Sequence, residues 1–478
     1  MTATTHHVHD LHHPHDPTTW TATRIRGSVA SGDTRAADVV EAHLARLDRL
    51  NPRIAAVTSR RDEEARRDAA AIDDAVARGE EVGPLAGVPI TVKETTDVAG
   101  LATTHGLRAF AGRVAQADAP PVDLLRRAGA IVIGHTNMPT LTLTGMHPRS
   151  ELFGDTVNPW DPQVTPGGSS GGDAAAVAAG LAACGLGNDA GGSTRLPAQF
   201  CGIAGMKPTP GRFPADHRIG PDDPSPASAL FPVDGPLART VADLRAVFEV
   251  LAVADPRDPR AVPAPLYGPE VPRTVGIVRD PGGHGVDQAV LTALDDAAQA
   301  LTDSGYRVVE TDVPMLDEAL EVYTGMVLTE FAGNWPAISA LVGPDASRYI
   351  NFDLDEHPPL DLPGYLGRAA RHLTVRRAWA RHAVDMPLLL GPVSTRASFT
   401  PGQESSSAEE KRRFGHSMTL NVWSTAVGAP AVAVPTGLAD GRPVGVQLIG
   451  PAWREDVVLD AAQAVENTCG VLTPTEPR

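Results

Sequence analysis

Thr165-Pro166-Gly167-Gly168-Ser169-Ser170-Gly171-Gly172 is the stretch that decides the fold of this chain, and Asp189-Ala190-Gly191-Gly192-Ser193-Thr194-Arg195 soon follows it. Each run places serine beside glycine. Glycine reaches positive φ without steric cost and lets a ligand come close to the main chain. Backbone N–H groups that converge in such a segment bind anionic oxygen. The two runs therefore predict an oxyanion hole beside serine hydroxyls.

Lysine is rare in this chain, which has 41 Lys plus Arg residues but lysine only at positions 93, 207 and 411. Arginine keeps its proton in proteins, whereas burial lowers the pKa of a lysine and makes it a base. Lys93 ends the apolar, β-like run of residues 88–93, where burial is expected. The alternative is a Lys93 that reaches solvent or pairs with Glu94, and this segment alone leaves both open.

Length and composition favour a soluble globular protein. The 478 residues suffice for one large α/β domain or for two to three average domains, and 42% are hydrophobic. A net charge of −17 argues against nucleic acid or an anionic membrane as partner, because both would repel the chain. The three cysteines, Cys184, Cys201 and Cys469, are too few and too scattered for a disulfide framework or a zinc site. We therefore expect a reducing cytoplasm and no metal.

The N-terminus is rich in histidine, with six of the sixteen histidines between His6 and His15. We expect residues 1–17 to form a disordered, solvated tail, with metal binding as the alternative. This segment lacks the charged-then-apolar order of a signal peptide, and no apolar run has the length that a bilayer requires. Residues 18–80 are predicted to form a helical segment that packs on the main domain.

The order of predicted elements indicates an α/β fold. Strand 88–92, helix 122–127 and strand 130–134 form a β–α–β unit, which predicts parallel strands. A helix over 33–50 is expected to end at Asn51-Pro52, and residues 402–412 are expected to form an exposed loop. The further helices are predicted at 62–79, 173–183, 241–252, 289–301 and 455–465, and the further strands at 186–189, 274–278, 306–310, 387–390, 431–434 and 444–449.

Three mechanisms compete for the glycine–serine run. A phosphate loop needs a lysine after its last glycine, but Asp173 follows here and would repel phosphate. A nucleophile elbow matches Gly167 to Gly171, yet an elbow follows a buried strand, and residues 158–166 contain three prolines. The third mechanism is a lysine and two serines that act as one unit.

From residue 81 onward the chain resembles the amidase signature family. The motifs that carry the resemblance are residues 85–93, 136–139, 158–160, 166–172, 189–197, 200–209, 234–240, 430–435 and 443–450. They are long and occur in the order that the family has. The resemblance implies an α/β fold with a mixed central β-sheet between layers of α-helices, over an amidase signature domain of residues 81–478.

The resemblance also implies a cofactor-free Ser–cis-Ser–Lys triad. Ser193 is expected to attack the amide carbonyl, while Ser169, after a cis peptide bond, passes the proton to a neutral Lys93. The residues whose backbone N–H groups are expected to form the oxyanion hole are Ala190, Gly191, Gly192 and Ser193. The residues expected to support the site are Ser170, Asp189 and Arg195.

Two departures from the family pattern bear on the substrate. Glu94 follows the lysine where the family usually has aspartate, and the segment after Pro139 lacks the glutamate that many relatives carry. The side chains predicted to line the substrate pocket are Leu143, Thr144, Met146 and His147, together with Phe331 and Trp335 from a variable region. An isolated histidine such as His147 is more often structural than catalytic.

The predicted function is hydrolysis of the C–N bond of a small linear amide through an acyl-enzyme. Esters and carbamates are open as further substrates, because the acyl-enzyme chemistry is shared. One alternative is the glutaminase component of a tRNA-dependent amidotransferase, which needs partner subunits. Another, from a different class, is a non-catalytic binding protein on the same scaffold. The expected partner is a small-molecule amide, and a homodimer is a family-level expectation.

Overall fold

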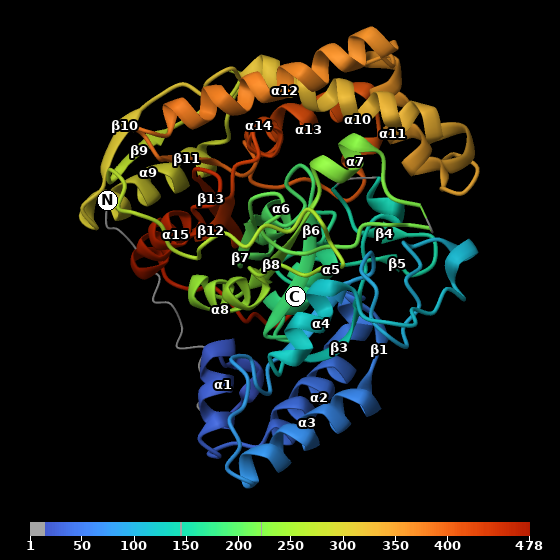
Figure 1. Ribbon diagram of the computed structural model, residues 1–478, viewed down its shortest axis with the longest axis vertical. Coiled ribbons are helices and arrows are strands. Elements are labelled where there is room, and N and C mark those ends of the chain that lie inside the picture. Colours follow the sequence, from blue (N-terminus) through green and yellow to red (C-terminus); the bar gives the residue numbers. More distant parts are fainter. Residues whose placement is uncertain (1–14, 144–145, 221) are drawn as a thin grey trace.

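A computed structural model describes residues 15–143, 146–220 and 222–478 of the chain (Figure 1). Its centre is an eleven-stranded sheet in the order β1-β3-β2-β6-β8-β7-β12-β13-β11-β9-β10. The strands of this sheet are β1 Val57–Arg60, β2 Pro89–Lys93, β3 Ile131–Thr136, β6 Cys184–Asp189, β7 Ala204–Lys207, β8 Val233–Ala238, β9 Thr274–Ile277, β10 Arg307–Glu310, β11 Leu388–Pro392, β12 Ala431–Ala439 and β13 Arg442–Ile449. A separate antiparallel pair consists of β4 Arg149–Ser150 and β5 Gly154–Asp155.

Helices surround this sheet. They are α1 Ala22–Ala30, α2 Ala36–Ile54, α3 Asp62–Ala77, α4 Pro120–Arg127, α5 Gly171–Ala178, α6 Arg195–Cys201, α7 Pro226–Leu230, α8 Val241–Leu251, α9 Gln288–Asp303, α10 Leu316–Ile338, α11 Pro344–Glu356, α12 Leu362–His382, α13 Ala408–Ser417, α14 Thr419–Ala426 and α15 Glu455–Cys469. The described residues also form the 3₁₀ turns η1 Pro17–Thr19, η2 Arg108–Phe110, η3 Thr140–Thr142 and η4 Gln403–Ser405. Figure 1 places α10 and α12 at one end of the long axis and α2 and α3 at the other.

The predicted α/β class and the mixed sheet are confirmed. Strand β2 runs parallel to both β3 and β6, whereas β6 pairs with β8 in the antiparallel sense. Strands β2 and β3 are buried along their whole length, as expected of parallel strands covered by helices. Because β2 lies next to β6, the carboxyl ends of these two strands bring Lys93 close to the segment that leads into Ser193.

The helix predicted over residues 33–50 does not end where the sequence predicted. Helix α2 continues through Pro52 to Ile54 and stops at Ala55, which has a left-handed φ of 52°. The ending at Asn51-Pro52 was therefore wrong. Proline lacks one N–H donor but lies here in the last turn, where the loss of a single bond is tolerated. The Asn51 side chain instead accepts the N–H groups of Ala56 and Val57 just after the helix.

The segment 402–412 was predicted as an exposed loop, and this prediction was also wrong. It contains η4 and the first part of α13, and Glu404 is only 1% exposed. The Ser407 hydroxyl caps α13 by accepting the N–H of Glu410, and Lys411 donates to Asp353 at 2.6 Å. Its polar composition serves capping and ion pairing rather than solvation.

The N-terminal part of the chain joins the main sheet through one strand. Strand β1, between α2 and α3, pairs with β3. Most of the tail predicted over residues 1–17 lies outside the described residues, which begin at His15. Among the described residues, none of the helices is both long enough and apolar enough to span a membrane.

Candidate active site

Lys93 ends β2 in the interior of the protein. Its side chain is fully buried, and Nζ lies 2.6 Å from Ser169 Oγ and 2.6 Å from Asn188 Oδ1. Burial lowers the pKa of Lys93, because desolvation disfavours the ammonium form, although nearby Asp173 and other carboxylates act in the opposite direction. The alternative in which Lys93 reaches solvent or pairs with Glu94 is wrong.

Ser169 lies between a cis peptide bond, Gly168–Ser169, and the start of α5. It is 1% exposed and touches the lysine. The neighbouring Ser170 connects this segment to the next strand: its hydroxyl donates to Asn188 O at 3.2 Å, and its N–H donates to Ser193 O at 3.0 Å. The two serine runs are therefore joined directly through backbone and hydroxyl bonds.

Ser193 lies in the turn between β6 and α6, so it is the second serine, not the first, that follows a buried strand and precedes a helix. The turn is shaped by the buried carboxylate of Asp189. Its oxygens accept the N–H groups of Gly191 at 3.1 Å, Gly192 at 2.7 Å and Thr194 at 3.2 Å. One carboxylate thus holds the backbone of the turn on both sides of Ser193.

Asp189 forms a buried ion pair with Arg195. Arg195 Nε and Nη2 donate to the two carboxylate oxygens at 3.0 Å each, and both side chains are 0% exposed. Burial alone would raise the pKa of Asp189, but the guanidinium and the backbone N–H groups hold it well below its usual range. Arg195 also donates to Ser424 and Gln447 at 2.8 Å, which ties the turn to α14 and β13.

Few residues of this turn reach the surface of the protein. Between Leu181 and Cys201 every residue is buried except Asn188, Ala190, Gly191 and Ser193, which are partly exposed. Within the described part of the chain, no group hydrogen-bonds the Ser193 hydroxyl or the backbone N–H groups of Ala190 and Ser193. A hydroxyl and two N–H donors are therefore free at one small exposed spot.

Gly192 is required by two features of this turn. Its φ is 120°, which side chains rarely adopt. A Cβ at this position would lie 2.5 Å from Met418 Cε and 2.8 Å from Asn421 Nδ2. The close approach of α14 and the residue before it therefore leaves no room for a side chain beside Ser193.

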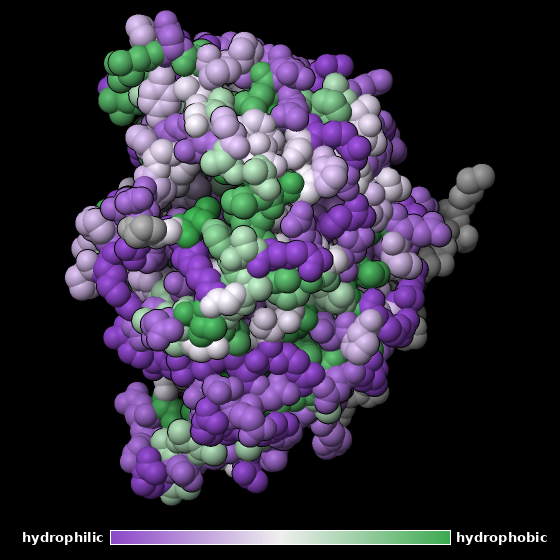
Figure 2. All heavy atoms as spheres, turned by 90° about the vertical axis from the view of Figure 1, so that its right-hand side faces the viewer, coloured by the Kyte–Doolittle hydropathy of each residue, from purple (hydrophilic) through white to green (hydrophobic). Residues whose placement is uncertain are grey.

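The predicted pocket residues fall into two groups. Leu143, Phe331 and Trp335 pack against one apolar cluster that contains Met146, Leu196 and Met418, and the rings of Phe331 and Trp335 are 5.6 Å apart. Thr144 lies outside the described residues. Figure 2 shows hydrophobic side chains gathered in the middle of the face that carries α11 and the β4–β5 pair in Figure 1. Their role as pocket lining stays a prediction.

His147 lies elsewhere, beside Thr165, the first residue of the glycine–serine run. It is 4% exposed, and Nδ1 lies 3.1 Å from Thr165 Oγ1. Thr165 Oγ1 accepts the N–H of Gly167 at 3.1 Å and donates to Met146 O at 3.0 Å. His147 therefore braces the segment that precedes Ser169, and its assignment to the substrate pocket stays a prediction.

Two residues at the site were missed by sequence reasoning. Asn188 accepts a hydrogen bond from Lys93 and donates from Nδ2 to Thr95 Oγ1 at 2.9 Å. It directly precedes the run that begins at Asp189, so its position on the strand was a usable signal. Tyr323 of α10 donates to Ala190 O at 2.7 Å. It lies in a helix without a recognisable motif, so the sequence held no signal for it.

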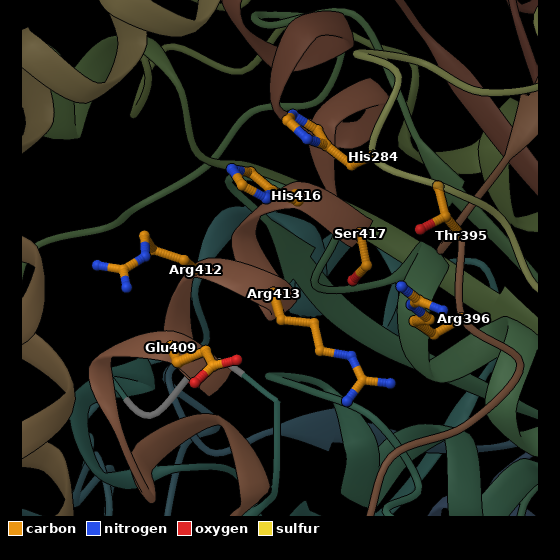
Figure 3. A pocket seen from close by; sticks show the side chains of 8 residues that line it. All are labelled: His284, Thr395, Arg396, Glu409, Arg412, Arg413, His416 and Ser417. Carbon is orange, nitrogen blue, oxygen red and sulfur yellow. The ribbon is translucent and has the colours of Figure 1, made fainter.

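A cavity of about 260 Å³ lies elsewhere, over α13 (Figure 3). Its lining consists of His284, Thr395, Arg396, Glu409, Arg412, Arg413, His416 and Ser417. The rings of His284 and His416 stack 3.6 Å apart, and the three arginines have carboxylate partners in Asp287, Glu356 and Glu410. None of the residues predicted for the site lines this cavity.

The mixed sheet flanked by helices is an α/β fold, and the comparisons with known proteins place the chain among the hydrolases. A family model described as Amidase matches residues 38–459. The chain belongs to the amidase family and is an amidase signature hydrolase.

Known relatives support this assignment along the whole chain. The chain is 40% identical over 457 residues to an indoleacetamide hydrolase of Bradyrhizobium diazoefficiens, which covers 95% of this chain and 87% of that protein. It is 32% identical over 498 residues to the A subunit of the glutamyl-tRNA(Gln) amidotransferase of Salinispora arenicola, covering 96% and 99%. Among solved structures, it is similar to a bacterial aryl acylamidase of the amidase signature family, with a TM-score of 0.81, 25% identity and coverage of 96% and 97%.

Proposed function

We propose that this amidase hydrolyses a small arylacetamide of the indoleacetamide type, with Ser193 as nucleophile. The observation that carries the proposal is the contact of 2.6 Å between the fully buried Lys93 Nζ and Ser169 Oγ. The 40% identity to an indoleacetamide hydrolase supports the choice of substrate. The apolar side chains of Leu143, Phe331 and Trp335 suit an aromatic acyl group.

The lysine acts in the neutral state that burial favours. A neutral amine has two N–H hydrogens and one lone pair. Asn188 Oδ1 can only accept, so it takes one N–H of Lys93, which leaves the lone pair for the hydroxyl proton of Ser169. Ser169 Oγ in turn accepts the proton of Ser193 as the Ser193 oxygen attacks the amide carbonyl.

The reaction then proceeds in two halves. A bond forms between Ser193 Oγ and the carbonyl carbon, and the proton moves through Ser169 to Lys93. When the C–N bond breaks, the proton returns along the same path to the leaving nitrogen, which departs as ammonia from a primary amide. Water, activated by the same relay, attacks the acyl-enzyme and releases the acid with Ser193 restored.

The N–H groups of Ala190 and Ser193 are the proposed donors to the developing oxyanion. These two donors have no acceptor among the described residues, whereas those of Gly191 and Gly192 already donate to Asp189. Gly191 and Gly192 would then keep the turn in shape. Loss of one oxyanion donor typically costs about 3 kcal/mol of barrier.

The glutaminase alternative has less support from the residues near the site. Glutamine carries an α-ammonium and an α-carboxylate, which would need charged or polar partners in the acyl pocket. Of the residues predicted to line that pocket, Leu143, Phe331 and Trp335 offer no such charged partner. The similarity to the glutaminase components of amidotransferases keeps glutamine in the test as the competing substrate.

The proposal is tested with the purified chain, indole-3-acetamide, glutamine and a fluorophosphonate probe. We expect hydrolysis of indole-3-acetamide, labelling of the peptide that contains Ser193, and loss of most turnover in Lys93→Ala with the fold intact. Labelling confined to Ser169 would contradict the assigned nucleophile. Turnover of glutamine alone would favour the amidotransferase component, and an unchanged rate in Lys93→Ala would reject the base.

A further inference from the structure

We infer that Glu94 is a positioning residue for substrate selection, because its buried carboxylate anchors the loop that supports the acyl side of the pocket. This inference rests on the proposed function, since it assumes that Leu143 and Trp335 face the acyl group. Glu94 directly follows Lys93, but none of its hydrogen bonds goes to the lysine. The Glu94 carboxylate instead binds the loop of residues 104–106.

The carboxylate of Glu94 is used entirely by one short loop. Glu94 is 0% exposed, and Oε1 accepts both the N–H and the hydroxyl of Thr104, the former at 3.1 Å. Its other oxygen, Oε2, accepts the N–H of Gly106 at 2.9 Å. A buried carboxylate without a bonded cation is costly, and burial raises the pKa of Glu94 to about 7. This unfavourable burial of Glu94 occurs directly beside Lys93, the proposed base.

The loop held in this way has an unusual backbone. His105 and Gly106 are consecutive residues in the left-handed region, with φ of 51° and 72°. A non-glycine residue there is strained and persists only where its surroundings hold it. The three bonds to Glu94 flank His105 on both sides, so they fix the conformation of this turn.

From this turn the contacts lead to the predicted pocket. His105 O accepts the N–H of Leu141 at 2.9 Å, and Leu141 precedes Leu143 by two residues. Leu107, which is 1% exposed, packs with Val342 and Ala346, and the same cluster includes Leu141, Leu143 and Trp335. Leu143 and Trp335 also belong to the apolar cluster around Met418, beside Gly192. A shift of the Glu94 turn therefore moves the wall that borders the acyl group.

Close packing makes this transmission stiff. A Cβ on Gly106 would lie 2.8 Å from Ser150 Cβ and 3.2 Å from Thr140 Cα, so the turn touches the start of η3 and β4 directly. Replacing Glu94 by aspartate withdraws the carboxylate by about 1.5 Å, the length of one carbon–carbon bond. The turn must follow or lose its bonds, and either change alters the position of Leu107 and Leu141.

The test compares a small alkyl and a bulky aryl fluorophosphonate as probes of Ser193 in the full chain. In Glu94→Asp, we expect the ratio of the rate constants, bulky over small, to fall about tenfold, as misplacement of about 1 Å can cost far more than that. With an arylacetamide as substrate, KM should rise more than kcat falls. Thr104→Val, which removes one donor to Glu94, should shift the ratio in the same direction if Glu94→Asp does not fold.

Glu466→Gln is the matched control. Glu466 is also a buried carboxylate with a raised pKa that accepts a backbone N–H, from Val241 at 2.7 Å, but it lies on α15. Its substitution should leave the ratio unchanged. An unchanged ratio in folded Glu94→Asp and Thr104→Val, with wild-type Ser193 labelled, would overturn this inference alone. Failure of both probes to label Ser193 in the wild-type chain would overturn the proposed function and the inference with it.

Discussion

In the proposed mechanism, Asn188 accepts one N–H of neutral Lys93 and leaves its lone pair for Ser169, and this role gives the first prediction. The amide oxygen takes an N–H of the lysine at 2.6 Å without adding a charge. In Asn188→Asp, a carboxylate at the same place would favour the ammonium form and raise the pKa of Lys93 by about 1 to 3 units. Because the proposed mechanism needs neutral Lys93 as its base, the rise of kcat/KM with pH should move by that amount toward alkaline pH.

A pH profile of kcat/KM with an arylacetamide checks this expectation. Thr95→Val is the control, because it removes only the second partner of Asn188, at 2.9 Å, and leaves the bond to Lys93. Its acidic limb should stay in place. If the limb of folded Asn188→Asp also stays in place, Lys93 is not the group whose deprotonation activates the enzyme.

Single residues of the site were predictable only where the sequence marks them locally. Glycines around Ser169 and Ser193, and the rarity of lysine, pointed to Lys93 and to the two serines. Tyr323 has no such mark, and the only mark of Asn188 is its place directly before Asp189. Asn188 gains its role from the pairing of β2 with β6, and Tyr323 from the packing of α10 over the turn at Ala190. Both roles arise from tertiary contacts, which a single sequence does not reveal.

At the scale of elements, the connection from β6 to α6 depends on the Asp189–Arg195 pair. Removing one partner of a buried ion pair leaves an uncompensated charge and typically costs about 3 to 5 kcal/mol. In Asp189→Asn, we expect a loss of that size in the free energy of unfolding, measured by urea denaturation. The variant should also lower kcat, because the carboxylate shapes the turn that carries Ser193.

The pair between Arg212 and Glu455 offers a control for this prediction. It is also 0% exposed on both sides and has a distance of 3.0 Å, but it joins α15 to the segment after β7. Glu455→Gln should lower the free energy of unfolding to a similar extent and leave kcat of the folded enzyme unchanged. Equal losses of kcat in both variants would mean that the effect of Asp189 is only a loss of stability.

Elements were predicted well where hydrophobic pattern determines them. The β–α–β unit around α4 was found because two apolar strands flank a helix, and such burial leaves a clear signal. The end of α2 and the segment 402–412 were missed for the opposite reason. Pro52 was taken as a helix-ending proline, although in the last turn of α2 it does not end the helix. The polar residues around Ser407 were taken as solvated, although Ser407 caps α13. The effect of proline or serine in these segments depends on its position relative to the helix end.

At the scale of the whole molecule, buried titratable groups make stability depend on pH in two opposed ways. Burial lowers the pKa of His43, His105 and His135 to about 4, so their contribution to stability is lost as pH falls through that value. Burial raises the pKa of Glu94 and Glu404 to about 7, so their contribution is present below the unfolded pKa and is lost as pH rises through 7. Buried groups of this chain therefore lower the free energy of unfolding at both acidic and alkaline pH.

Glu404 allows a clean test of the alkaline side of this balance. It is 1% exposed, its Oε2 has no partner among the described residues, and the charged groups near it are Arg149, which lowers its pKa, and Asp345, which raises it. Glutamine mimics the neutral form. Glu404→Gln should therefore raise the free energy of unfolding at pH 8 by on the order of 2 to 3 kcal/mol and change it little at pH 4. Urea denaturation at both pH values measures the difference. An equal effect at the two pH values would show that Glu404 does not change its charge between them in the folded chain.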